Sequence, residues 1–254
     1  MDRKPFTPPF VSSSLPAWRC PFCNESALSL VTGSLDDPET EQSKRDRSDV
    51  SWEPDWVRKN FAMTLKCSRC DNTVFVVGKV THVEADDEEF GWHLVEALDP
   101  KFFQPATPLI AIPSKTPAGV VEEISGASSL FWSSPPSAAN RLRVALERLM
   151  DDRKIPRKQK SSKKKLVELS LHARIEKYSL KNTEVGAKLL AIKWIGNSGS
   201  HIAKLTSTDV LDGFELLAHA LEEIYDSKST RLKKLADSIN KKRGPRKKKK
   251  PAGP

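Results

Sequence analysis

Four cysteines are the residues of this chain with the clearest chemistry. They form two C-x-x-C pairs, Cys20 with Cys23 and Cys67 with Cys70, and no further cysteine is left over. Two intervening residues let a tight turn aim both sulfurs of a pair at one ion. Four thiolates make the tetrahedral, soft shell that zinc prefers and leave no position open for water, so the sequence predicts a structural Zn²⁺. An iron centre or a pair of redox dithiols is the alternative.

A second group of residues lies near the end of the chain, in the segment LLAIKWIGNSGSH. Lys193, Asn197 and His201 are spaced at i, i+4 and i+8, so a continuous helix would place them along one face. Gly196 lies between them, and a glycine inside a helix costs about 1 kcal/mol, which indicates close approach by another backbone or a turn. The alternative is a helix that ends at Gly-Asn, with His201 in the following loop. We interpret Trp194 as a buried interface residue, and His172 and His219 as structural or solvated.

The first half of the chain must position the cysteines. Val74 to Val77 follow the second knuckle with β-branched and aromatic residues, and an apolar stretch follows the first knuckle. These flanks are typical of a small β zinc ribbon, which we expect over residues 18–98, after an extended N-terminus at 1–17. Residues 36–51 are polar and without periodicity, so we interpret them as an inserted loop.

The second half of the chain is expected to be helical. Five prolines between residues 99 and 118 exclude a helix there and predict a linker. Beyond it the apolar residues recur with a period of 3.6, which predicts four or five helices packed as a bundle over 119–228, before a basic tail at 229–254. The fold class predicted is therefore α+β by segregation, a small zinc ribbon followed by an all-α bundle. The expected helices cover 120–131, 135–149 behind an N-cap at Ser134, a third starting with Leu166, Leu169 and Ala173, a fourth over 185–192, and a fifth over 210–224 with a capping box at Thr206 and Asp209.

The charge of the chain is concentrated in two short segments. The net charge is +9, yet residues 153–165 and 241–250 each carry eight basic residues and no acidic one. The remainder holds 26 basic and 33 acidic residues, a net charge of −7. Such segments suit RNA or another polyanion through counterion release; a solvated loop and a disordered tail are the alternative. The candidate nucleic-acid contacts are Lys163, Lys164, Lys165, Arg246, Lys247 and Lys248.

The order of these features resembles a known family. A C-P-x-C and a C-x-x-C knuckle, a Pro-rich linker, a helix reading LRVALERLM and the later IKWIGNSGSH are similar to a zinc-ribbon-bearing bacterial family of unknown function in the HEPN superfamily. HEPN domains are helical domains named for higher eukaryotes and prokaryotes nucleotide-binding. The resemblance covers most of residues 18–228, and it implies a HEPN-like helical bundle.

The resemblance also implies a set of site residues. HEPN nucleases of this branch carry approximately R-x-x-G-N-x-x-x-H, which falls here on Lys193, Gly196, Asn197 and His201, and an earlier R-x-x-x-E, which falls on Arg143 and Glu147. Lys193 departs from the pattern, because a lysine keeps the charge of arginine but loses its bidentate fork. The implied chemistry is metal-independent RNA cleavage at the interface of a homodimer. His201 would move the protons, Lys193 would stabilise charge on phosphorus oxygens, and Asn197 would hold the imidazole or a phosphate oxygen.

These features together give three functional hypotheses. The first is an endoribonuclease of a bacterial defence or stress system, held silent by a partner protein or antitoxin, where the setting is implied by the resemblance. The second is a non-catalytic nucleic-acid-binding or protein-interaction subunit, and the third is a zinc-ribbon DNA-binding regulator. No stretch of the sequence has the apolar length of a membrane span or of a signal peptide, so we expect a cytoplasmic protein with no membrane contact.

Overall fold

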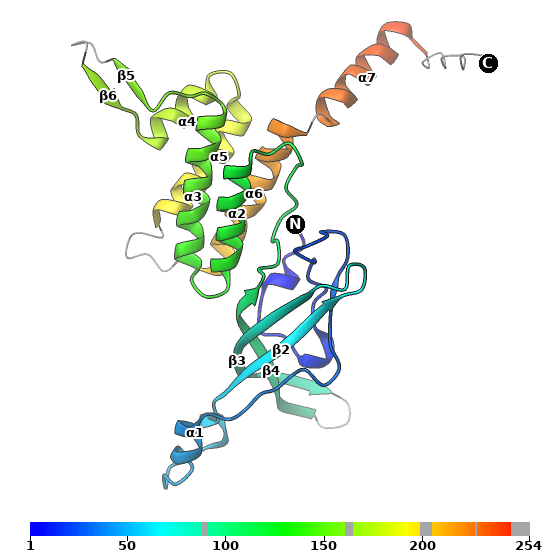
Figure 1. The fold of residues 1–254 in the computed structure, drawn as a ribbon, viewed down its shortest axis with the longest axis vertical. Helices are drawn as coiled ribbons and strands as arrows, with labels where there is room; N and C mark the ends of the chain where they lie inside the picture. Colours follow the sequence, from blue (N-terminus) through cyan, green and yellow to red (C-terminus); the bar gives the residue numbers. More distant parts are fainter. Residues whose placement is uncertain (88–90, 161–164, 199–204, 227, 245–254) are drawn as a thin grey trace.

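The computed structural model describes residues 1–87, 91–160, 165–198, 205–226 and 228–244. A curled four-stranded antiparallel sheet forms the N-terminal half, and helices form the C-terminal half beyond one end of the sheet (Figure 1). The strands are β1 (Leu28–Leu30), β2 (Lys59–Cys67), β3 (Thr73–Asp87), β4 (Gly91–Gln104), β5 (Lys158–Lys160) and β6 (Leu166–Glu168). The α-helices are α1 (Glu41–Asp46), α2 (Ala118–Phe131), α3 (Pro135–Asp152), α4 (Leu171–Ser179), α5 (Thr183–Ser198), α6 (Ser207–Tyr225) and α7 (Lys228–Lys242), and short 3₁₀ helices cover Lys4–Phe6, Ser12–Ser14 and Pro54–Trp56.

The predicted fold class is wrong. The N-terminal half is not a small ribbon, since β3 and β4 run for 15 and 14 residues and pair with each other in a sheet of order β1-β2-β3-β4. The helical half is not all-α either, because β5 and β6 form an antiparallel hairpin between α3 and α4. The chain is therefore a mixed α/β protein in which a sheet precedes the helices.

Two residues explain why the sheet extends into the predicted linker. Strand β4 continues to Gln104, and Pro100 lies opposite Gly78 next to a shift of register between Val77 and Gly78. Proline is compatible with an edge strand or a bulge, where the missing N–H is not needed by the sheet. A Cβ at Gly78 would lie 2.3 Å from the carbonyl oxygen of Asp99, so the close approach of β4 requires glycine there. The Pro-rich connection is thus shorter than predicted and begins after Gln104.

Most of the predicted helices are present. Helices α2, α3, α5 and α6 cover the expected segments, and Thr206 and Asp209 form the expected capping box at the start of α6. The predicted helix start at Leu166 is wrong, because Leu166 belongs to β6. Helix α4 begins at Leu171 instead, where the side chain of Ser170 accepts a hydrogen bond from the backbone N–H of Ala173 at 3.2 Å. The Ser170 cap therefore sets the start of α4, which the spacing of apolar residues had placed too early.

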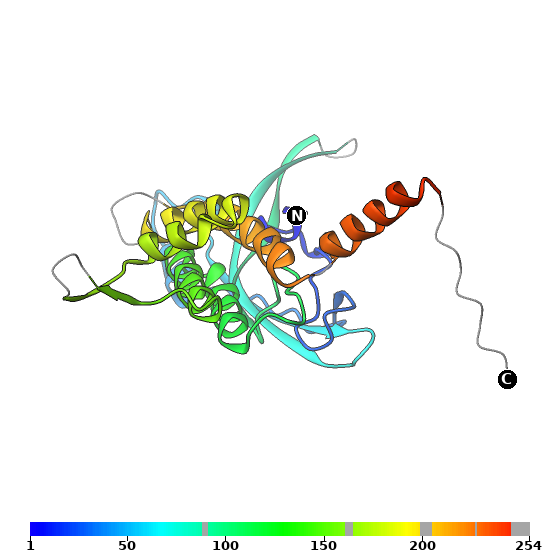
Figure 2. The same ribbon diagram turned by 90° about the horizontal axis from the view of Figure 1, so that it is seen from above.

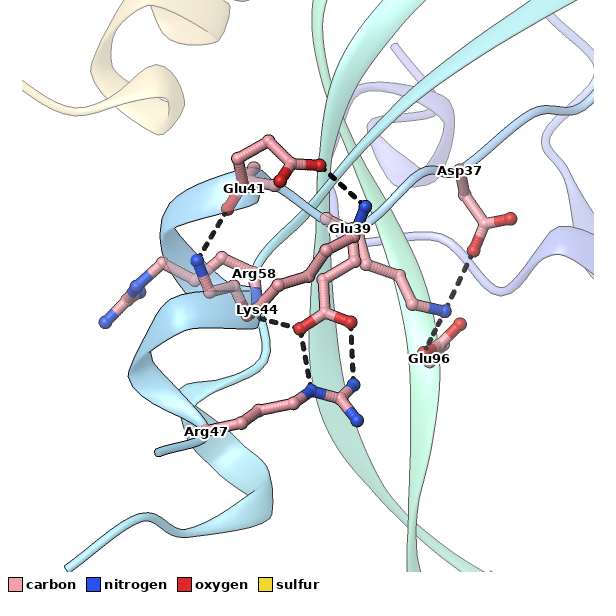
Figure 3. Close-up of polar contacts among 10 residues, drawn as sticks. Asp37, Glu39, Glu41, Lys44, Arg47, Arg58 and Glu96 are labelled. Atoms are coloured by element: carbon pink, nitrogen blue, oxygen red, sulfur yellow. Dashed lines mark hydrogen bonds and ion pairs between the residues drawn. The ribbon is translucent and has the colours of Figure 1, made fainter. Parts of the chain in front are cut away.

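The segment 36–51, interpreted from the sequence as an inserted loop, is bridged to β2 at Asp36 and Glu39. It contains α1, and Arg47 donates to both carboxylate oxygens of Glu39 at 3.1 and 2.6 Å (Figure 3). Hydrogen bonding to Arg47 holds the pKa of Glu39 below its ordinary value. Lys59 of β2 bridges Asp37 and Glu96 at 3.1 and 2.7 Å, so this segment, β2 and β4 are connected by one ammonium.

Aromatic side chains join the two halves. The ring of Trp132, just after α2, lies 4.8 Å from the ring of Phe103 on β4 and 6.4 Å from the ring of Trp18. The indole N–H of Trp18 donates to the carbonyl of Pro5 at 2.6 Å, which fixes the N-terminal segment over the same cluster. Trp18 and Phe103 are buried, and one continuous apolar core runs through both halves.

The helices at the end of the chain differ in how they pack. Helices α2 to α6 lie side by side, whereas α7 projects away from them (Figures 1 and 2). Within the described part of the chain, no helix is both long and apolar enough to cross a membrane.

Candidate metal centre and helical site

The fold brings the four cysteines together. Cys20 and Cys23 lie in the loop before β1, Cys67 is the last residue of β2, and Cys70 lies in the turn before β3. Their sulfur atoms all lie within 4.8 Å of one another, with 3.6 Å between Cys20 and Cys70 and 3.7 Å between Cys23 and Cys67. All four are free thiols, so the described chain shows a cluster and no disulfide.

Backbone amides point at the sulfur atom of the first cysteine in each pair. The N–H of Phe22 donates to the Sγ of Cys20, and the N–H of Arg69 donates to the Sγ of Cys67, both at 3.4 Å. Backbone hydrogen bonds, with that from Cys70 the strongest, lower the pKa of Cys67 to about 6, whereas burial raises the pKa of Cys20 to about 11. Amide donors stabilise a thiolate, which is the form that binds a metal.

The two knuckles have the same local geometry. Asn24 and Asp71 each follow the second cysteine of a pair, and each has a φ of 57°. Their N–H groups donate to the carbonyls of Cys20 and Cys67 at 3.0 and 3.1 Å. Asn and Asp tolerate the left-handed region better than other non-glycine residues, which explains their place at the end of each turn.

The donor set fits a metal ion. Four sulfur donors converge from two matching turns, and the pairing of Leu28 with Cys67 between β1 and β2 fixes one turn relative to the other. The cluster can therefore hold a metal through four protein ligands. The predicted convergence of these four cysteines is confirmed: they form a cluster that is compatible with metal binding.

The second candidate site lies on α5. Lys193 is buried, with 9% of its surface exposed, and its Nζ lies 3.3 Å from the ring centroid of Trp194. Among the residues that the structure describes, no carboxylate forms an ion pair with Lys193. The aromatic ring stabilises the ammonium, yet no carboxylate in the described part of the chain neutralises its charge.

Gly196 sets the distance between α5 and α3. A Cβ at this position would lie 2.8 Å from the Cβ of Arg143 and 2.9 Å from the carbonyl oxygen of Ala139. Glycine is therefore required by the close approach of another helix, which is one of the two explanations that its sequence position suggested. Asn197, half-buried, follows directly on the same helix, four residues after Lys193, so α5 presents both on one face next to this contact.

Arg143 and Glu147 belong to a larger ionic cluster. They pair at 3.7 Å along α3, and Glu147 also accepts from Arg174 at 2.9 Å. Arg174 donates further to Asp151 at 2.6 Å and to the carbonyl of Ile155 at 2.9 Å, and only 1% of its surface is exposed. The buried Arg174 of α4 thus connects this helix to α3 through Glu147, the glutamate of the R-x-x-x-E pair, and through Asp151.

Sequence reasoning missed Arg174, although a signal existed. The buried residues of α4 are Leu171, Arg174, Ile175 and Tyr178, which recur at i, i+3, i+4 and i+7. An arginine in phase with an apolar stripe must be buried, and a buried guanidinium needs carboxylate or carbonyl partners. That phase alone indicated a structural ion pair in the helical half.

His172 and Trp194 lie next to each other on α4 and α5. Their rings are 5.7 Å apart, and the Nε2 of His172 lies 3.4 Å from Glu176. Trp194 has 55% of its surface exposed in the single chain, so it is not buried within one copy, and its predicted place in an interface stays a prediction. It carries the Lys193 ammonium on its ring at the surface of the helical half.

Several predicted site residues lie outside the described part of the chain. Helix α5 is described to Ser198, and His201 falls in the gap that follows it. Of the candidate nucleic-acid contacts, Lys165 is described and exposed, beside the exposed Lys158 and Lys160 of β5. The others lie outside the described residues: Lys163, Lys164, Arg246, Lys247 and Lys248.

Comparison with known proteins adds two family matches. Residues 8–103 match a family described as a domain of unknown function (DUF8608), and residues 125–242 match another described in the same terms (DUF4145). No curated protein matches the chain, and no solved structure does. The chain is thus similar to one domain over the sheet that carries the four cysteines and to a second over most of the helical half.

Proposed function

We propose that the chain is a zinc-stabilised protein that cleaves RNA with its helical half, as a metal-independent endoribonuclease. Zinc is proposed for the cysteine cluster because four thiolates in two C-x-x-C turns are its preferred structural shell. With four protein ligands the ion supplies folding energy and takes no part in cleavage. The sheet half then serves as a scaffold on which the helices are mounted through Trp18, Phe103 and Trp132.

One observation carries the proposal of RNA cleavage: the ammonium of Lys193 lies on the exposed ring of Trp194 and has no carboxylate partner among the described residues. An ammonium without a carboxylate partner can bind an anion, and a phosphodiester is the anion that the HEPN resemblance implies. Arg143 lies against the same turn of α5, which adds a second cation. Together they would stabilise charge that develops on the phosphorus oxygens during attack by the ribose 2′-hydroxyl.

The remaining groups have roles in the same proposal. His201 would take the proton from the 2′-hydroxyl or return one to the leaving 5′-oxygen, because an imidazole titrates near neutral pH. Asn197 would orient the imidazole or a phosphate oxygen. Two copies of the chain would supply two imidazoles, one for each proton transfer, in a homodimer. The expected products are a 2′,3′-cyclic phosphate and a 5′-hydroxyl. A bacterial defence or stress system, with a partner protein or antitoxin as the regulator, is the setting proposed with it.

The test is a cleavage assay on the full-length chain with 5′-labelled single-stranded RNA in EDTA, at a chelator level that leaves the protein-bound metal in place. Lys193→Ala is expected to lower the rate by about 100-fold, the usual effect of removing one group that stabilises transition-state charge. Lys188→Ala is the matched control, since Lys188 is on the same helix but pairs with Glu223. Lys193→Arg restores a cation with a bidentate fork and is expected to retain activity.

A second protein variant and a modified RNA substrate test the chemistry of cleavage. His201→Ala is expected to abolish cleavage, and RNA with a 2′-deoxy sugar at the cleaved nucleotide is expected to resist the wild type. Intact RNA with the wild-type chain would refute the proposal. Equal cleavage by the wild type, Lys193→Ala and His201→Ala would also refute it, because the activity would not come from this site.

A second function is favoured by the exposed lysines of the hairpin: Lys158 and Lys160 lie on β5, and Lys165 immediately precedes β6. We propose as the alternative a non-catalytic nucleic-acid-binding or protein-interaction subunit. It predicts RNA that stays intact but is retarded in a gel, with strong salt dependence. Removal of residues 241–254 should then flatten the salt slope.

A further inference from the structure

The outer face of the sheet carries an apolar strip that the core does not use. Phe75 and Val77 of β3 and Phe102 of β4 have 56%, 43% and 54% of their surface exposed. Their neighbours along the strands, such as Val76 and Phe103, are buried on the opposite face. An antiparallel sheet with one solvated face normally places polar residues there. Contiguous exposed apolar side chains of this kind mark a binding surface.

The register makes these side chains neighbours. Val77 pairs directly with Phe102 across β3 and β4, and Phe75 lies two residues along β3 on the same face. Side chains in such direct and diagonal positions are within reach of one another. A groove of about 410 Å³ lies along this strip, with Val77 and Phe102 in its lining. The exposed ring of Phe102 therefore lines this groove, and the exposed ring of Phe75 lies on the same face of the sheet outside the lining of the groove.

Lysines border the strip. Lys66 and Lys79 stand on the same face at its two ends, and Lys101 lines the groove beside Phe102. Lys66 pairs with Asp71 at 3.0 Å and Lys101 with Asp99 at 2.6 Å, while Lys79 forms no ion pair within the described chain. The groove also has one acidic residue in its lining, Asp36. Asp36, Asp71 and Asp99 thus balance the three lysines, and Lys79, opposite Asp99 in the register, is the one without an ion pair among the described residues. Its ammonium and the exposed rings are complementary to a phosphate with flat bases beside it.

We propose that this face binds single-stranded nucleic acid. The bases stack on Phe75 and Phe102, and the phosphates lie toward Lys66, Lys79 and Lys101. Stacking on aromatic side chains in a basic groove binds single strands with little dependence on sequence, and the open face of a four-stranded antiparallel sheet is a surface that RNA-binding domains use in this way. A duplex is excluded, because its bases are already stacked. The site does not depend on the helical half or on cleavage.

The test measures binding of fluorescein-labelled dT12 to the full-length, zinc-loaded chain by fluorescence anisotropy. DNA lacks the 2′-hydroxyl, so the ribonuclease activity proposed above cannot alter the probe, and the two proposals fail separately. The assay is run at about 300 mM salt, where binding through the lysine-rich segments is screened and stacking persists. Wild-type protein is expected to bind dT12 at least tenfold more tightly than a duplex of the same length.

Variants locate the site. Phe75→Ala and Phe102→Ala are each expected to weaken binding of dT12 about tenfold and to leave duplex binding unchanged. Trp92→Ala is the matched control, because Trp92 is also on β4 and is 74% exposed, but lies away from the strip. Lys79→Gln is expected to reduce the slope of log affinity against log salt by about 0.7.

The result that would overturn the proposal is equal binding of dT12 by the wild type and by the Phe75→Ala, Phe102→Ala double variant, with circular dichroism and zinc content unchanged. Loss of binding in Trp92→Ala to the same extent would also overturn it. A double variant that changes from dimer to monomer in sedimentation, without a change in dT12 affinity, would assign the strip to contact between two copies instead.

Discussion

Gly196→Ala tests how much the close contact between α5 and α3 contributes to the stability of the protein. An alanine would gain about 1 kcal/mol from its higher helix propensity. Against this, its Cβ would meet the Cβ of Arg143 at 2.8 Å and the carbonyl oxygen of Ala139 at 2.9 Å. Neither atom can rotate away, because one is a backbone atom and the other is fixed to the backbone. Helix α3 would have to shift as a whole.

The magnitude follows from that rigidity. Overpacking costs about 1–3 kcal/mol, and the upper end applies here because α3 is packed through the fully buried Leu142 and Leu146. After the helix gain is subtracted, Gly196→Ala should be about 2 kcal/mol less stable than the wild type. For a chain of this length that corresponds to a fall of about 4–8 °C in melting temperature.

Urea unfolding of the zinc-loaded chain, followed by circular dichroism at a helix band, measures the effect. Gly126→Ala in the middle of α2 is the matched control, since its Cβ would meet only the flexible end of Arg141, with Nε at 3.0 Å. That variant should be as stable as the wild type or up to about 1 kcal/mol more stable. The argument is refuted if both glycine variants change stability by the same amount, or if Gly196→Ala is as stable as the wild type.

Two further predictions concern the metal and the ionic cluster. Elemental analysis should find one zinc ion per chain. Cys67→Ser should lose the ion, and its free energy of unfolding in urea should fall by several kcal/mol, whereas the exposed Ser68→Ala should keep both the ion and the stability. Zinc retained in Cys67→Ser would contradict the assigned ligands. Hydrogen bonds led by that from Arg157 lower the pKa of Asp151 from 3.8 to about 2, so its contribution is present above about pH 4 and is lost as pH falls toward 2. After a discount for partial exposure it amounts to about 1 kcal/mol, and the difference in unfolding free energy between the wild type and Asp151→Asn should shrink by the larger part of that amount from pH 5 to pH 2.5. A difference that does not change with pH would contradict this.

Local features were predictable because neighbouring residues decide them. The C-x-x-C spacing sets a turn that any fold must accommodate, and both knuckles have the predicted geometry. The period of apolar residues located α2, α3, α5 and α6, because one buried stripe per helix is visible in the sequence itself. The capping box at Thr206 and Asp209 is equally local, since it joins residues three apart.

The errors arose where pairing between distant residues overrides a local signal. Pro100 indicated a linker, yet the bare backbone of Gly78 on the neighbouring strand admits it into β4. Leu166 fitted a helical stripe, yet its segment pairs with β5 instead, and the helix begins only after the Ser170 cap. For Pro100 the deciding partner is distant in the sequence; for Leu166 it is the neighbouring hairpin strand together with the Ser170 cap, and the spacing of apolar residues reveals neither.

The sequence by itself determined which four cysteines cluster, most helices, and the residues of one turn of α5. Only the tertiary structure decided that the cysteine turns belong to a long four-stranded sheet, that Arg174 is buried against Glu147 and Asp151, and that Phe75 and Phe102 share an open face. The physical reason is that turns and helices are stabilised by contacts within a few residues. Strand register, helix contact and side-chain burial depend instead on surfaces that meet only after the chain has folded.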